Sequence, residues 1–130
     1  MDLATLQARA LAAREVTRSV GAITYHLRLP TQHDILVAAQ RTGALKVQGD
    51  AAAMLLLNRS VLEAAVIGWT GARVGHILPA DPEAGAPLAW EAGAVPLLLD
   101  ARPDDAVALQ DLLTERTAAR RAALEADSGN

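Results

Sequence analysis

A strict alternation of side chains over residues 22–29 constrains the fold of this chain more than any other feature. Every second residue there is large and apolar, namely Ile23, Tyr25, Leu27 and Leu29. This period of two is typical of a β-strand that buries one face. The β-branched segment before it joins it at Gly21, which predicts a hairpin with its turn at residues 19–22. Because two strands alone are marginally stable in water, we expect helices to cover this hairpin.

Helical patterns flank the hairpin on both sides. Before it, leucines at helical spacing predict a helix from Asp2, as the cap, to about Ala13. After it, Thr31 and Asp34 stand three residues apart, a spacing typical of a helix N-terminus in which the hydroxyl accepts a backbone N–H. Gly43 then predicts the end of that helix.

The most apolar segment of the chain predicts the central helix of the core, over residues 51–68. Asp50 is its expected cap, and Trp69 closes it. Its apolar face is expected to be buried as a whole. The residues of that face are Met54, Leu55, Leu57, Val61, Leu62, Ala65, Val66 and Trp69.

Proline and acidic residues organise the rest of the chain. A short helix is expected near residues 89–100, bent or restarted at Pro96, and a last helix begins at Pro103. That helix carries an apolar stripe that includes Leu109 and Leu112, whereas residues 125–130 have nothing to bury and are expected to be disordered. The patterns predict an α+β fold: a mainly helical single domain over residues 1–124, with one N-terminal β-hairpin.

Aromatic residues are scarce, so each of them should matter to packing. Phe is absent, Tyr occurs once and Trp twice. We expect Tyr25, Trp69 and Trp90 to act as structural anchors together with Leu109 and Leu112. The two tryptophans bound an irregular segment, and we expect them to hold its ends against the core. Its middle should then be mobile, with protease cleavage concentrated at residues 78–86.

Charge, cysteine content and hydropathy restrict the class of protein. A net charge of −3 does not supply the basic surface that phosphate backbones require, so nucleic acid is not an expected partner. The absence of Cys fits a reducing compartment. The apolar segment after residue 50 carries Arg59 and Glu63 near its middle, which argues against a membrane span, and the N-terminus does not read as a signal peptide. A cytoplasmic protein that binds no membrane is expected.

No catalytic or metal-binding motif emerges from the spacing of polar residues. His26 and His33 lack the spacing of paired ligands on a helix, and His76 stands alone. The glycines around residue 73 lack the order of a phosphate loop, and the adjacent Asp104 and Asp105 suit the positive end of a helix. We therefore expect no enzymatic activity, no cofactor and no metal.

The order of capping and packing motifs carries a family resemblance over residues 23–121. A strand leads into a Pro-Thr helix start, a Trp closes the middle helix, and a Leu-rich turn precedes a Pro-Asp helix start. The residues in these motifs are Leu29, Pro30, Thr31, Trp69, Leu97, Leu98, Leu99, Asp100, Pro103 and Asp104. In this order the chain resembles the tail assembly chaperones of long-tailed bacteriophages and prophages.

The resemblance implies a non-enzymatic assembly factor of the bacterial host cytoplasm. Such a chaperone keeps the tape measure protein soluble, helps to recruit tail tube protein, and is absent from the finished virion. Two other classes remain open: a small structural virion protein, such as a neck or tail-terminator component, and a bacterial protein-interaction adaptor. An alanine-rich, arginine-rich last helix also permits self-association.

The hairpin offers the most accessible surface for a partner. Thr24, His26 and Arg28 form the polar face of its second strand, and the edges of a two-stranded sheet lack pairing partners. The expected helices, by contrast, use most of their apolar surface for a small core. We therefore predict that tail proteins contact these three residues and the adjoining helix over residues 30–43.

Overall fold

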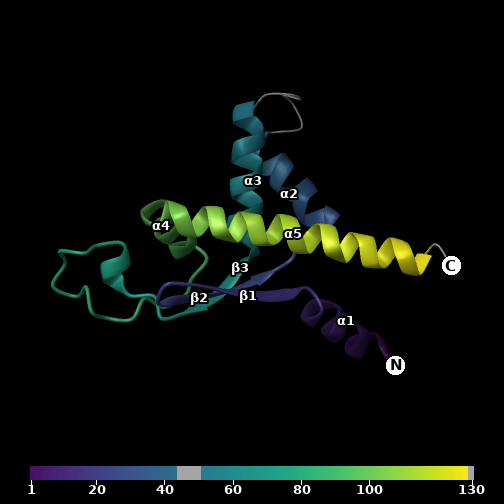
Figure 1. Cartoon of the computed structure of the whole chain (residues 1–130), viewed down its shortest axis with the longest axis horizontal. Helices are drawn as coiled ribbons and strands as arrows, with labels where there is room; N and C mark the ends of the chain where they lie inside the picture. The colour runs from purple at the N-terminus through teal and green to yellow at the C-terminus, as the bar shows by residue number, and fades with distance from the viewer. Residues whose placement is uncertain (44–50, 129–130) are drawn as a thin grey trace.

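A three-stranded antiparallel sheet is the centre of the structure, a computed structural model that describes residues 1–43 and 51–128. The hairpin strands β1 (Glu15–Val20) and β2 (Ile23–Arg28) are joined at the expected turn, and β3 (Val66–Thr70) pairs with β2 on its other side. The helices are α1 (Leu3–Ala12), α2 (Gln32–Thr42), α3 (Ala51–Ala65), α4 (Ala94–Ala101) and α5 (Pro103–Ser128). This is the predicted mainly helical α+β domain (Figure 1).

The alternating face of β2 forms the middle of the core, as the sequence predicts. Ile23, Tyr25 and Leu27 are fully buried. They pack with the end of α3, with α4 and with the inner face of α5, where Leu109 and Leu112 are buried. Four of the five predicted anchors, Tyr25, Trp69, Leu109 and Leu112, are therefore core residues. The buried face of the strand, with its period of two, packs against the apolar stripe of the helix.

The predicted helix over residues 51–68 is wrong in its last turn. The helix α3 ends at Ala65, and Val66–Thr70 form the third strand, with Trp69 opposite Tyr25. The switch has a physical cause. The segment begins with β-branched Val66 and Ile67, and as a strand it satisfies its backbone groups against β2 while burying Val66 and Trp69. Trp69 is thus a buried strand residue and does not close a helix.

The prediction that the whole apolar face of α3 is buried is also wrong. Met54, Leu55 and Leu56 are exposed, because α2 and α3 project from the sheet as a pair and only the C-terminal end of α3 reaches the core (Figure 1). The apolar side chains of the projecting end have no sheet beneath them. The predicted cap, Asp50, lies outside the described residues.

The helix starts of the second and last helices confirm the sequence patterns. Thr31 caps α2 in a reciprocal capping box with Asp34, and Gly43 ends it in the left-handed conformation. Pro103 is the first residue of α5. Pro96 neither bends nor restarts α4, because it lies in the first turn, where its missing N–H has no intrahelical partner to lose.

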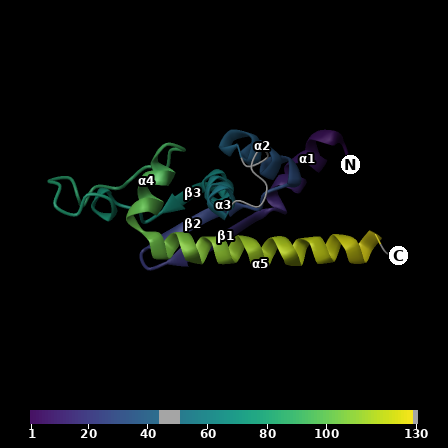
Figure 2. The same cartoon turned by 90° about the horizontal axis from the view of Figure 1, so that it is seen from above.

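The C-terminal tail was predicted to be disordered from residue 125, but α5 continues through Ser128. Its C-terminal half extends past the sheet, and Arg121 to Asp127 are exposed (Figures 1 and 2). Helix propagation adds one hydrogen bond for each further residue, so a helix already fixed by Leu109 and Leu112 continues at little cost.

The segment between the two tryptophans is held as predicted, although its path is more regular than expected. The Trp69 indole donates to the Leu88 carbonyl at 2.8 Å, and the Trp90 indole donates to the Val66 carbonyl at 3.2 Å. Between them, residues 71–89 project as an arm with a short 3-10 helix (Val74–His76) and backbone hydrogen bonds across its base (Figure 1). Trp90 itself remains 39% exposed, so it anchors by its N–H rather than by burial.

Candidate functional site

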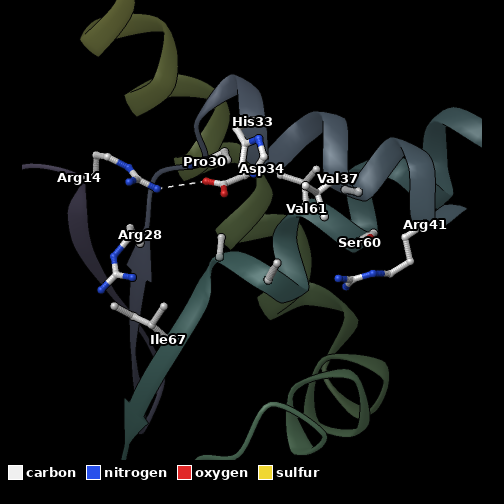
Figure 3. Close-up of a pocket in the computed structure, with 13 residues that line it drawn as sticks. Arg14, Arg28, Pro30, His33, Asp34, Val37, Arg41, Ser60, Val61 and Ile67 are labelled. Atoms are coloured by element: carbon white, nitrogen blue, oxygen red, sulfur yellow. Dashed lines mark hydrogen bonds and ion pairs between the residues drawn. The ribbon is translucent and has the colours of Figure 1, made fainter. Parts of the chain in front are cut away.

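A groove of about 380 Å³ lies between the hairpin, α2 and α3. Its wall is basic on two sides (Figure 3). Arg14 and Arg28 reach into it from the hairpin side, and Arg41 reaches in from α2. It combines charged groups with accessible apolar side chains, which makes it the candidate site of interaction.

The mouth of the groove is built by Arg14. Its Nε donates to the Leu29 carbonyl at 2.9 Å, and its Nη2 contacts Asp34 Oδ2 at 3.1 Å (Figure 3). Asp34 is already held by the capping box, in which the same Oδ2 accepts the Thr31 N–H at 2.8 Å. The chain before β1 and the first turn of α2 are therefore joined through one carboxylate.

Only some of the hydrogen-bond donors of the Arg28 guanidinium have a partner in the described structure. Its Nη2 lies 3.4 Å from Glu15 Oε1, in an exposed pair that stabilises little. Its Nε is buried and has no hydrogen-bond partner in the described structure. A buried donor without a partner carries a desolvation cost.

The charge of the lining favours an anionic ligand. Arg14, Arg28 and Arg41 contribute three positive charges, Asp34 contributes one negative charge, and so the net charge of the ionised lining residues is +2 with His33 neutral. Guanidinium groups suit carboxylates because they bind them in a bidentate manner.

The floor of the groove is apolar. Val37 from α2, Val61 from α3 and Ile67 from β3 line it, together with small alanines. Val37 is 37% exposed, and Val61 and Ile67 are half-buried. A ligand with an apolar side chain beside a carboxylate therefore matches both parts of the groove.

The predicted partner-binding residues do not form one cluster. Arg28 lines the groove, whereas Thr24 shares a hydrogen bond of 2.9 Å with Ser19, and His26 packs beside Gly68 over a separate hollow that Arg116 also lines. All three are half-buried rather than solvated.

The premise of a free edge on this strand is wrong. β2 is the central strand, with β1 on one side and β3 on the other, so both of its backbone edges are paired. No partner strand can add to it. The unpredicted third strand is the reason, and any contact through Thr24, His26 or Arg28 must use side chains.

Sequence patterns missed most of the groove. Arg14 and Asp34 lie 20 residues apart and Ile67 follows a helix, so no local spacing joins them. Asp105 was also missed, because its place in the first turn of α5 had a sufficient explanation in the helix dipole. It is buried and binds Tyr25 and Arg102.

His76 serves the arm rather than the groove. Its Nδ1 accepts the Arg73 N–H at 2.8 Å, and burial, followed by the nearby Arg102 and Arg73 charges, lowers the pKa of the imidazole. Residues 1–43 and 51–128 contain no group of three or more His, Asp or Glu side chains placed to hold a metal ion. Over the same residues, none of the helices has the length and apolar character needed to cross a bilayer.

No protein-family model matches the chain, and comparison with curated proteins and with solved structures finds no significant match.

Proposed function

We propose that this protein is a non-enzymatic tail assembly chaperone of a phage or prophage, which keeps the tape measure protein soluble and helps tail tube assembly. In this role it acts in the bacterial host cytoplasm and is absent from the mature virion. The order of capping and packing motifs in the sequence motivates the proposal, and the groove between the hairpin, α2 and α3 supports it.

The observation that carries the proposal is the pairing of an apolar floor with a cationic rim. A long tape measure helix exposes an apolar stripe until the tube encloses it. In the groove, Val37 and Val61 can take apolar side chains from such a stripe, while Arg41 is placed to meet a flanking carboxylate. The exposed Leu55 and Leu56 at the far end of α3 extend the apolar surface away from the sheet.

Co-expression with a fragment of the tape measure protein tests this proposal. We expect the chaperone to raise the soluble yield of the fragment and to co-purify with it. Arg41→Glu should reduce co-purification about tenfold or more, since it places a like charge opposite the acidic flank of the ligand. Val37→Asp should do the same by charging the apolar floor.

Arg121→Glu is the matched control, because it reverses an exposed arginine on α5, outside the groove. It should leave co-purification unchanged, and all three variants should keep the melting temperature of the parent. Equal recovery of the fragment by the folded Arg41→Glu and Val37→Asp variants would contradict the proposal. Mass spectrometry of purified virions separates the chaperone from a structural tail component, which would persist in the particle.

A further inference from the structure

No strand among the described residues pairs with the outer edge of β1, which leaves backbone hydrogen-bonding groups free at alternate residues. β1 is an edge strand, and Thr17, Arg18 and Ser19 are exposed. The Leu29 N–H donates to the Arg14 carbonyl at 2.7 Å, which identifies that pair as hydrogen-bonded. Hydrogen-bonded and non-hydrogen-bonded pairs alternate in an antiparallel ladder. The register therefore directs the backbone N–H and C=O groups of the even-numbered residues of β1 toward β2.

The odd-numbered residues of β1 then face outward. The N–H and C=O groups of Glu15, Thr17 and Ser19 point away from β2, along an edge that a further strand can join. An edge of this kind recruits an extended segment by main-chain hydrogen bonds, and side chains beside it decide which segment fits.

The first half of α5 provides the neighbouring side chains. A groove of about 490 Å³ lies between β1 and α5, which run beside each other in both views (Figures 1 and 2), and Arg18 lines it from the strand. Asp104, Asp111 and Glu115 line it together with the 61% exposed Val107. None of these carboxylates lies within ion-pair distance of a described cation, so their charge faces the open groove.

We propose that the β1 edge binds an extended segment of another protein in which Lys or Arg occupies every second position. Alternate side chains of the added strand would lie on the α5 side of the sheet, about 6.7 Å apart. Asp111 and Glu115 are about 6 Å apart along the helix axis, so consecutive basic side chains meet consecutive carboxylates. The opposite side chains would lie beside Thr17 and Ser19 and need only be polar.

A second copy of this chain fits the edge less well. One Arg and three carboxylates give this groove a net charge of −2, so a dimer through β1 would bring six carboxylates and only two arginines together. A basic segment neutralises the same carboxylates instead. This surface is separate from the groove that contains Arg28, and the inference does not rest on the proposed chaperone function.

The test uses the whole protein and a synthetic peptide, TKTKVKT, which places its lysines on one face of a strand. We expect it to bind in a fluorescence anisotropy titration and to slow amide hydrogen exchange at Glu15, Thr17 and Ser19. The peptide KKKTTVT has the same composition without the alternation and should bind about tenfold more weakly, as should TETEVET with reversed charge.

Variants of β1 and of α5 test the main-chain pairing and the charges separately. Thr17→Pro removes one outward N–H without removing a β1–β2 bond and should weaken binding about fivefold to tenfold, whereas Thr17→Val keeps the N–H and should bind like the parent. Should Thr17→Pro fail to fold, Asp111→Asn combined with Glu115→Gln tests the charges alone and should weaken binding about tenfold.

Three outcomes would overturn the inference. The first is equal binding of TKTKVKT and its shuffled form, which would indicate charge attraction without strand pairing. The second is unchanged affinity in the folded Thr17→Pro and Asp111→Asn/Glu115→Gln variants. The third is a stable homodimer in sedimentation that protects the amides of Glu15, Thr17 and Ser19, which would assign the edge to a second copy.

Discussion

The hydroxyl of Tyr25 donates a hydrogen bond of 2.5 Å to Asp105 Oδ2 and joins the central strand to the first turn of α5. Tyr25 is fully buried and Asp105 is 3% exposed. The Arg102 Nε also donates to Oδ2, so the buried carboxylate has two donors. The only tyrosine of the chain therefore positions the longest helix on the sheet.

Tyr25→Phe tests this connection. The variant keeps the ring and removes one hydrogen bond to a charged group, which should lower the free energy of unfolding by about 1.5 to 3 kcal/mol. Asp105→Ala should cost more, because it leaves both Tyr25 and Arg102 without an acceptor. Urea titration measures both effects. A Tyr25→Phe variant with the stability of the parent would show that the hydroxyl contributes nothing to the fold.

Alkaline pH should destabilise the protein through the same residue. Burial, and then the Asp105 carboxylate, raise the pKa of Tyr25 well above its ordinary value of 10.0. The folded state keeps the proton, whereas the unfolded state releases it above pH 10. This contribution is therefore complete below pH 10 and decreases by about 1.4 kcal/mol for each pH unit above it.

Tyrosinate absorbance should then appear only together with unfolding, as measured by parallel circular dichroism. Tyr25→Phe should flatten the decrease of stability at high pH, because the group that titrates is gone. Tyrosinate formation in a protein that keeps its native spectrum would contradict the expectation.

Gly71→Ala should be among the most damaging small substitutions. Gly71 has φ +81°, and a Cβ there would collide with the Ala22 carbonyl. Strain and collision together should cost at least about 2 kcal/mol. Gly85→Ala is the control, because its added Cβ meets nothing within 4 Å and the φ of Gly85 lies outside the left-handed region. A thermal melt of Gly71→Ala that matches the Gly85→Ala melt would refute this account of the turn after β3.

The two faces of α5 should respond differently to a charge. Leu112 is 7% exposed in the core and Val107 is 61% exposed. Leu112→Asp should destabilise the domain by at least about 3 kcal/mol, by analogy with a buried charge left without its partner. Val107→Asp should change stability by less than about 0.5 kcal/mol. A cooperative, unshifted melt of Leu112→Asp would place this stripe on a partner surface instead of in the core.

Limited proteolysis should show how strongly the two tryptophan hydrogen bonds fix the ends of the arm. In the parent, cleavage should concentrate at residues 78–86 of the projecting arm. Trp69→Phe removes the donor to the Leu88 carbonyl and should accelerate that cleavage. Trp90→Phe removes the longer bond of a more exposed indole and should have the smaller effect. An arm as resistant as α3 in all three proteins would contradict this expectation.

Some features of the fold follow from short-range sequence alone. The capping box of Thr31 and Asp34 spans three residues, and the left-handed Gly43 ends the same helix. The buried alternation of Ile23, Tyr25 and Leu27 is equally local. In each case the physical determinant is a backbone hydrogen bond or a side-chain period that neighbouring residues complete among themselves, so the sequence by itself determined them.

Tertiary structure decided whatever depends on a distant partner. Val66–Thr70 continue an apolar helix in the sequence, and they form a strand only because β2, about 40 residues earlier in the chain, provides the hydrogen bonds. The same holds for Asp105, whose burial depends on Tyr25, and for the groove, which needs Arg14, Asp34 and Ile67 from three separate segments of the chain. Such contacts stabilise the protein only when distant segments are packed together, so no local spacing in the sequence predicts them.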